Sequence, residues 1–371
     1  MANLYDANAN WSSRSNDERY TSLFDMRDHF DDMRQKSASK VYKLSDLSFV
    51  ADAENNNKLS VVGPSGNPAL INGYGFESLT VLAKAPKGFL SSLPNKLTAD
   101  VLNHKLKDNH DEIGMLMTQE SKKTPIVMRA ATTPNYGRIW NSQVLNALTH
   151  KFGDGVTGDW HVPGEFGKPV PVTQKNTTLY AGEQDMFVFL CDESHTLEIN
   201  NRRDDKPGML SRGFFVVNSE VGTQPLRFTT FLYDYVCANR IIWGAQEINT
   251  ITIKHTLNAP ERWLESIAPT LQDYANGKAS ETEQVLKLAQ TMTIGQTLDD
   301  TYDFLETHFG TRKIAKAINK AHLDDEGRDI TTLWDAVTGV TAYARNMPFQ
   351  NERVLIEAKA GKLLDMAKEA A

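Results

Sequence analysis

The sequence predicts an α+β protein with a mixed, largely antiparallel sheet core and a helical C-terminal region. Between residues 46 and 258, short β-branched or aromatic runs are separated by turn residues, which is typical of antiparallel strands. After Pro260, apolar residues recur at helical spacing almost to the end of the chain. Hydrophobic residues make up 40% and charged residues 23% of the chain, which excludes a disordered or collagen-like protein.

Local patterns place the individual elements. One helix is expected to begin at Asn141 or Ser142, with an apolar face that runs from Val144 to Phe152. Further helices are expected at 76–83, 98–107 and 231–238. Strands are expected at 58–62, 125–131, 185–192, 196–200, 213–218, 241–243 and 250–255. The chain is predicted to have three regions: a polar N-terminal arm (1–45), an α/β core (46–258) and a helical C-terminal region (259–371).

The charge balance restricts the classes of partner. Forty Lys and Arg residues against 47 Asp and Glu residues give a net charge of −7, so nucleic acid would bind only at a local basic surface. Cys191 and Cys237 are too few for a disulfide framework or a multi-thiolate zinc site, and we expect buried thiols in a reducing cytoplasm. Since the chain has neither a membrane-spanning run nor a signal-peptide pattern, we expect no membrane association.

The common catalytic and nucleotide-binding motifs are missing. No P-loop is present, and the G-x-G-x-x-G match at 153–158 follows a helical segment instead of a strand, so it predicts a loop. The nine histidines lack metal-ligand spacing. The acidic pair Asp204-Asp205 is typical of a solvated turn, with a magnesium site as the alternative. We expect neither a metal nor a cofactor.

Two segments are basic against this acidic background. Residues 121–175 carry seven cations and three acids, interleaved with aromatic residues. Cations that hold phosphates, beside aromatics that stack on unpaired bases, form single-strand grooves. The alternative, favoured for most of these aromatics, is that they belong to the core. In residues 311–320, three cations recur at i, i+4 and i+8 on one helix face, which either tracks a nucleic-acid backbone or is simply solvated. The predicted nucleic-acid contacts are Lys122, Lys123, Arg129, Tyr136, Arg138, Trp140, Trp160, Arg312, Lys316 and Lys320.

A polar motif, Asn218-Ser219-Glu220, closes an apolar strand just before a turn at Gly222. It is either a functional site or a structural network of polar contacts. In the structural network, Asn218 and Ser219 would hydrogen-bond turn amides, and Glu220 would pair with Arg212 or Arg227. We favour the structural interpretation.

The segment GFFVVNSEVG (213–222), followed by Val-Cys-Ala-Asn at 236–239, resembles an uncharacterised family of phage, prophage and plasmid proteins. In that family, N-S-E-V-G precedes a C-x-N-G turn. Thr-Pro-Asn-Tyr at 133–136, the segment that begins at Arg138, and TLWDAVTGVT at 332–341 also fit. The resemblance covers about residues 58–371, although Arg240 replaces the turn glycine and the family's N-terminal W-x-x-L-G is missing. The family-motif residues are Asn218, Ser219, Glu220, Gly222, Cys237 and Asn239.

The resemblance implies a mobile-element protein in the cytoplasm of a host cell. The leading hypothesis is a non-enzymatic, homo-oligomeric factor that binds or anneals single-stranded DNA during replication or recombination. Its groove would be lined by residues 121–175 and backed by the 311–320 helix. The alternative is a host-interaction protein that inhibits a restriction or other antiphage defence enzyme, with a host or phage protein as its partner. A metal-dependent enzyme that uses Glu220, Asp204 or Asp205 is the third hypothesis.

Overall fold

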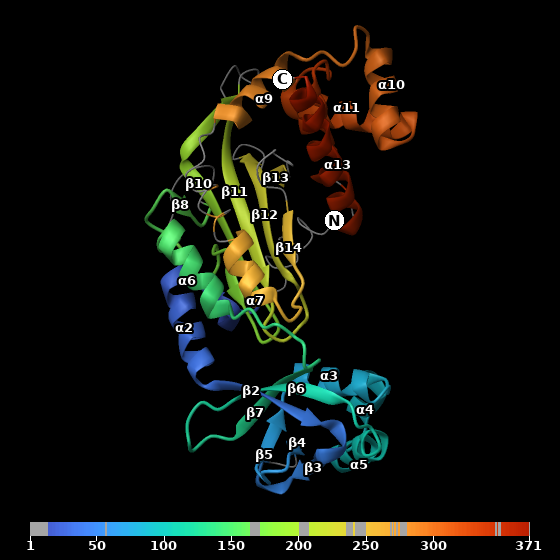
Figure 1. Ribbon diagram of the computed structural model, residues 1–371. Helices are drawn as coiled ribbons and strands as arrows, with labels where there is room; N and C mark the ends of the chain where they lie inside the picture. Colours follow the sequence, from blue (N-terminus) through green and yellow to red (C-terminus); the bar gives the residue numbers. More distant parts are fainter. Residues whose placement is uncertain are drawn as a thin grey trace.

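The computed structural model describes residues 14–55, 58–163, 171–199, 208–234, 240–241, 250–267, 269, 271, 274, 280–345, 347 and 350–370. Over these residues the chain forms two β-sheets and a C-terminal group of helices. The three parts follow one another along an elongated molecule, with the N-terminal sheet at one end and the C-terminal helices at the other (Figure 1).

The N-terminal sheet has six strands in the order β2-β6-β7-β5-β4-β3, of which only β5 and β7 pair in parallel. The strands are β2 (Ser37–Lys43), β3 (Ser48–Asp52), β4 (Lys58–Val62), β5 (Pro68–Ile71), β6 (Glu112–Thr118) and β7 (Ile126–Thr132). Its accompanying helices are α3 (Gly73–Leu82), α4 (Lys87–Ser92) and α5 (Asn95–Leu106). These helices and the sheet bury a common core that includes Leu79, Leu102 and Met128.

The second sheet is antiparallel and has the strand order β1-β9-β10-β11-β12-β13, with β8 on β10 and β14 on β12. The strands are β1 (Arg19–Tyr20), β8 (Trp160–His161), β9 (Leu179–Ala181), β10 (Met186–Ile199), β11 (Gly208–Asn218), β12 (Leu226–Asp234), β13 (Arg240–Ile241) and β14 (Thr250–Ile253). One face is covered by α2 (Leu23–Gln35), α6 (Asn141–Phe152) and α7 (Ala259–Arg262), which continues into the π-helical η5 (Trp263–Ile267) (Figure 1). Phe30, Leu148 and Trp263 pack there against Phe214 and Phe228.

The C-terminal helices bury a third core, to which β10 and β11 contribute Leu197 and Leu210. They are α9 (Ser280–Thr291), α10 (Leu298–Phe309), α11 (Arg312–Glu326), α12 (Leu333–Arg345) and α13 (Gln350–Glu369). Three short 3-10 helices lie near the N-terminus: η1 (Asn16–Glu18), η2 (Leu44–Asp46) and η3 (Ala53–Asn55).

Helix α12 begins with a capping box, because the Asp335 N–H donates to Thr332 Oγ1 (3.1 Å) and the Thr332 N–H donates to Asp335 Oδ2 (3.0 Å). The TLWD part of the family-like segment is therefore a helix start.

The α+β class is confirmed, but three local predictions are wrong. The described part of the N-terminal arm belongs to the body of the protein, because Leu23 and Met26 of α2 are completely buried and β2 joins the first sheet. Residues 231–234 belong to β12 and not to a helix, since pairing with β11 overrides their local pattern. The two strands expected at 185–192 and 196–200 are one strand, β10, with an irregular register between Asp192 and Leu197.

The structure bears on two expectations from composition, the burial of the cysteines and the lack of a membrane-spanning segment. Cys191 is a completely buried cysteine, as expected, whereas Cys237 lies outside the described residues. Among the helices in the described part of the chain, none is long and apolar enough to cross a bilayer.

Candidate functional site at the junction of the two sheets

Glu220 lies two residues after the end of β11, at the place where the second sheet meets the first, and its side chain is only 2% exposed. Its Oε2 accepts a hydrogen bond from Arg129 Nη1 of β7 (3.0 Å), and its Oε1 accepts one from the backbone N–H of Asn141 (2.9 Å). Asn141 is the first residue of α6, so the carboxylate occupies the positive end of that helix dipole. Arg138 Nη1 donates to the Glu220 carbonyl oxygen. One side chain thus connects β7, β11 and α6.

Arg129 faces Glu220 at a β-bulge. Leu116 of β6 pairs with Ala130 and Met117 pairs with Met128, which leaves Arg129 as the extra residue of β7. A bulge locally breaks the alternation of side chains and re-aims the extra one. The side chain of Arg129 is 6% exposed, and its charge is neutralised by Glu220.

Asn218 and Ser219 complete the polar network. Asn218 Nδ2 donates to Ile139 O (2.9 Å) and to Asn141 Oδ1 (2.8 Å). Ser219 Oγ accepts the N–H of Gly222 (3.1 Å), which has a φ of +100° that only glycine adopts readily. Ser219 therefore binds a turn amide as the structural interpretation expects, whereas Asn218 bonds to the segment before α6 and to its first residue instead of to the turn.

The predicted partners of Glu220 are wrong. Arg212 pairs with Asp192 (2.8 Å), and Arg227 Nη2 donates to Gln224 Oε1 (3.1 Å). Both arginines lie on the strands of the second sheet, whereas the ion-pair partner of Glu220 comes from the first sheet.

Aromatic rings surround this network. Tyr136 donates its hydroxyl to Ser219 O (2.8 Å) and stacks on His255 with a ring-centroid distance of 4.9 Å. Burial raises the pKa of Tyr136 and lowers the pKa of His255. Burial also lowers the pKa of Arg138, whose guanidinium lies over the rings of Tyr136 (5.1 Å) and Trp140 (5.7 Å). The ring faces of Tyr136 and Trp140 are therefore already occupied by protein groups.

A groove of about 770 Å³ opens beside the network. Its walls come from α3, the start of β6, the end of β7 and the turn at Val221-Gly222. The lining includes Asp111 and Glu112 but neither Lys nor Arg, and no described residue forms an ion pair with either carboxylate. This groove is therefore acidic and suits a cationic or neutral ligand rather than a phosphate.

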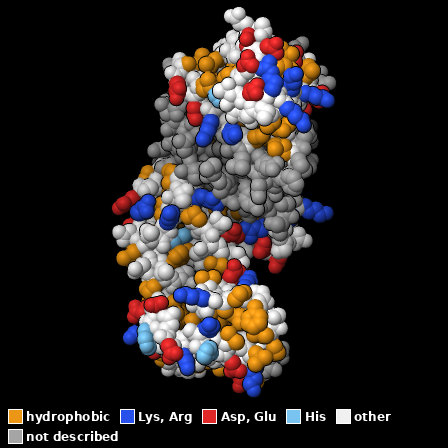
Figure 2. All heavy atoms as spheres, turned by 90° about the vertical axis from the view of Figure 1, so that its right-hand side faces the viewer, with side chains coloured by type: hydrophobic (Ala, Val, Ile, Leu, Met, Phe, Trp, Pro, Cys, Tyr) orange, Lys and Arg blue, Asp and Glu red, His pale blue; other side chains and the backbone are white. Residues whose placement is uncertain are grey.

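An apolar surface adjoins the groove. Val81 of α3, Phe89 of α4 and Leu97 of α5 are 72%, 56% and 51% exposed. Val81 also lines the groove, so the two features are continuous. Figure 2 looks onto these helices and shows hydrophobic side chains gathered on the N-terminal unit. We call Val81, Phe89 and Leu97 the apolar patch. Exposed apolar patches beside polar residues are typical of protein interaction sites.

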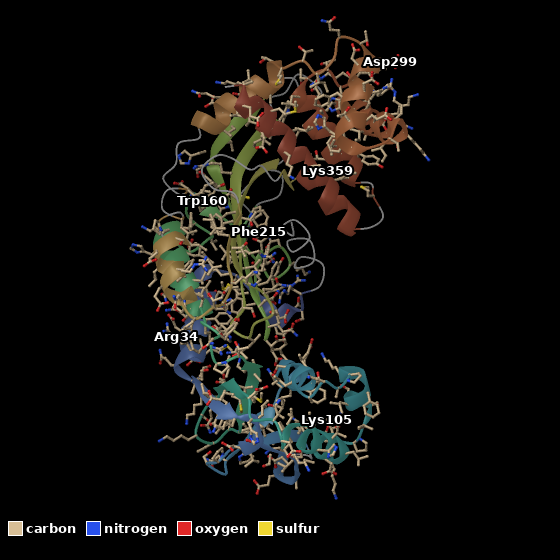
Figure 3. The ribbon with its side chains drawn as sticks, turned by 45° about the vertical axis from the view of Figure 1, so that its right-hand side comes forward. Arg34, Lys105, Trp160, Phe215, Asp299 and Lys359 are labelled. Atoms are coloured by element: carbon tan, nitrogen blue, oxygen red, sulfur yellow. The ribbon has the colours of Figure 1, made fainter. Side chains whose placement is uncertain are left out.

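Three of the predicted nucleic-acid contacts are wrong because tertiary packing buries them. Arg129 and Arg138 are 5% and 9% exposed and are bound to Glu220. Trp160 packs in the core under α6, with its ring 5.2 Å from Phe152 (Figure 3). The half-buried Trp140 lies beneath Arg34 as well as Arg138.

The remaining predicted contacts do not form one groove. Lys122 and Lys123 are exposed in the β6–β7 loop of the N-terminal sheet, whereas Lys316 and Lys320 are exposed on α11 at the other end of the molecule (Figure 1). Arg312 pairs with Asp299 (2.7 Å) and Asp303, so it is not a free cation. The proposal that α11 backs the 121–175 segment is therefore wrong.

Some of the predicted site residues lie outside the described residues, namely Cys237, Asn239, Asp204 and Asp205. Over the part of the chain that the structure describes, no three His, Cys, Asp or Glu side chains are placed to hold a metal ion. Both oxygens of Glu220 accept protein hydrogen bonds, which does not support a metal-dependent role for this carboxylate.

The apolar patch and the acidic groove were missed from the sequence, although one signal was present. Along α3, Phe76, Leu79 and Ala83 recur at helical spacing, and Val81 falls off that face. An apolar residue that lies off the buried face of a helix is expected to be exposed to solvent. Comparison of the chain with protein-family models, curated proteins and solved structures finds no match.

Proposed function

We propose that this is a non-enzymatic binding protein whose partner is another protein, a host or phage component held by the apolar patch and the acidic groove. The observation that carries the proposal is the continuity of the patch with a groove that contains Asp111 and Glu112 and no cation. Phosphates would be repelled from such a groove, whereas an apolar segment with a basic side chain is complementary to it. This is the host-interaction hypothesis, with its binding surface on α3–α5.

The buried network supports this function by holding one wall of the groove in place. Val221 and Gly222 line the groove directly after Glu220, and Tyr136 lines it while donating to Ser219 O. A rigid wall lowers the entropic cost of ordering a binding site when a partner arrives. The Asn218-Ser219-Glu220 motif thus acts by positioning the groove and not by touching substrate.

A photocrosslinking amino acid placed at Phe89 tests this proposal in cells that contain the partner. A matched probe at Leu264, 61% exposed on η5, is the control. A protein that crosslinks to the probe at Phe89 but not to the probe at Leu264 would be the candidate partner. It would then be purified, and its binding to this chain would be measured. We expect Phe89→Asp to weaken its binding at least tenfold, about 1.4 kcal/mol, because an aromatic side chain that the partner would bury is lost. Equal weakening by Leu264→Asp, or unchanged binding by Phe89→Asp, would contradict the proposal.

Single-stranded DNA binding is the second candidate, favoured by the exposed Lys122 and Lys123, which have no ion pair with any described residue. A labelled oligonucleotide titrated over a salt series tests it. Affinity should fall steeply with salt and be lost on Lys122→Glu/Lys123→Glu, but not on Lys105→Glu, an exposed control on α5 (Figure 3). Absent or salt-insensitive binding would remove this candidate. Homo-oligomerisation, a host-cytoplasmic location and membership of the phage and plasmid family stay predictions.

A further inference from the structure

The two edges of the N-terminal sheet differ. At one edge, β3 is closed by α5, because Asn103 Oδ1 accepts the N–H of Phe49 (2.8 Å) and Asn103 Nδ2 donates to Phe49 O (2.7 Å). At the other edge, β6 is the one strand among the described residues that pairs with β2. Ala38, Ser39, Lys40 and Val41 of β2 are all exposed. One edge is therefore covered by the protein, and the other is open.

The open edge is regular. The β2–β6 register runs from Ser37 opposite Thr118 to Lys43 opposite Glu112 without a shift. Neither a proline nor a bulge interrupts β2, although natural proteins commonly protect exposed edges with such features. Seven consecutive residues are thus available as a template for another strand.

The direction of each backbone group follows from the ends of this ladder. The Gln119 N–H donates to Lys36 O (3.0 Å), and the Leu44 N–H donates to Asp111 O (3.0 Å). Hydrogen-bonded residues alternate along an antiparallel pair, so the even-numbered residues of β2 face β6. Ser39 and Val41 then direct their N–H and C=O groups outward. No backbone hydrogen bond within the described residues uses these groups.

The charge of the edge decides what it can pair with. β2 carries Lys40 and Lys43 and no acid, and neither lysine forms an ion pair with a described residue. A second copy of this chain, paired antiparallel in register, would place Lys40 opposite Lys40, and like charges in that position are destabilising. An acidic strand would instead place a carboxylate beside Lys40 on one face of the sheet or beside Lys43 on the other, because side chains alternate along a strand.

We propose that the open edge of β2 binds an acidic, extended segment of a partner protein, which adds to the N-terminal sheet as a seventh strand. Main-chain hydrogen bonds to Ser39 and Val41 hold the segment, and Lys40 and Lys43 select its charge. Lys43 lies opposite Glu112 of the groove, but the backbone groups of Ser39 and Val41 belong to neither the groove nor the apolar patch, so the proposal does not depend on the function proposed above.

Fluorescein-labelled peptides test the proposal by fluorescence anisotropy on the full chain: the acidic EVEVEVE and the basic KVKVKVK. We expect only the acidic peptide to bind, and its affinity to fall at least tenfold on Lys40→Glu/Lys43→Glu. Val41→Pro removes an outward N–H while leaving the hydrogen bonds to β6 intact, so binding should be lost in a folded protein. Val41→Thr keeps the N–H and is the matched control. Hydrogen exchange of β2 in the native chain should slow when EVEVEVE binds.

Several outcomes would overturn the proposal. Equal binding of both peptides would show that the edge does not select charge, and unchanged binding by Val41→Pro would show that its backbone is not used. Absence of EVEVEVE binding up to about 1 mM would show that the edge does not accept another strand and that its lysines protect it from pairing. A dimer that Val41→Pro dissociates would identify a second copy as the occupant. Phe89→Asp should not affect peptide binding, which separates this test from that of the proposed function.

Discussion

Replacing Glu220 by Gln removes the negative charge that Arg129 faces inside the junction. The two side chains are 2% and 6% exposed, and the distance from Arg129 Nη1 to Glu220 Oε2 is 3.0 Å. Gln keeps the volume of Glu but offers only one acceptor oxygen to the two donors, Arg129 Nη1 and the Asn141 N–H. One buried donor then lacks an acceptor, and the arginine charge is unpaired. Breaking a buried ion pair in this way costs about 3–5 kcal/mol of unfolding free energy.

A double-mutant cycle isolates the contribution of the pair. Arg129→Met alone leaves the Glu220 carboxylate buried without its cation, and it should destabilise the protein by a similar amount. The double variant Arg129→Met/Glu220→Gln removes both charges of the pair. We therefore expect it to lose less stability than the sum of the single variants, by about 1–3 kcal/mol.

Urea unfolding, followed by circular dichroism and by tryptophan fluorescence, provides the assay. Both probes are needed because two sheets with separate cores can unfold in separate transitions. Glu198→Gln on β10 is the control, since this exposed carboxylate should change stability by less than about 0.5 kcal/mol. A loss below about 1 kcal/mol for Glu220→Gln, or a coupling near zero, would refute the role assigned to the pair.

Three further substitutions test other parts of the structure. Trp160→Ala should destabilise the protein by about 3–5 kcal/mol in thermal unfolding, because the ring lies in the core; an unchanged melting temperature with loss of DNA binding would contradict this. Gly137→Ala should cost about 1–3 kcal/mol, since its Cβ would overlap the carbonyl oxygen of Thr256, and a neutral effect would argue against that packing. Burial raises the pKa of Asp335, but hydrogen bonds and the charge of Arg328 outweigh it and hold the pKa below its ordinary value. Its stabilisation is therefore present at neutral pH and is lost as the pH falls through the folded-state pKa, so the melting-temperature difference between the wild type and Asp335→Asn should shrink below about pH 4.

Short-range patterns were enough for much of the fold. The helix expected at Asn141 or Ser142 is α6, which begins at Asn141 and buries its apolar face from Val144 to Phe152. The strand predicted at 58–62 is β4 (Lys58–Val62). These predictions succeeded because hydrophobic periodicity and turn residues act within a few positions of the chain. Where pairing between distant strands overrode that preference, as at residues 231–234, the local prediction failed.

The candidate site depended on contacts that no short pattern contains. The polar character of Asn218-Ser219-Glu220 was evident from the sequence, but its ion-pair partner was not, because Arg129 lies 91 residues away and faces it at a β-bulge. For the same reason the basic count of residues 121–175 was misleading, since Arg129 is ion-paired with Glu220 and Arg138 is buried against the backbone of the same residue.

Composition and periodicity were thus sufficient for the α+β class, the limits of several helices and strands, and the position of the polar motif. Tertiary structure alone decided which charges are exposed and where the apolar patch meets the acidic groove. The physical reason is that burial and ion pairing depend on which distant segments meet, whereas secondary-structure preference depends mainly on neighbouring residues. The same net charge of −7 therefore describes a chain whose cations are partly paired inside it and partly exposed at both ends.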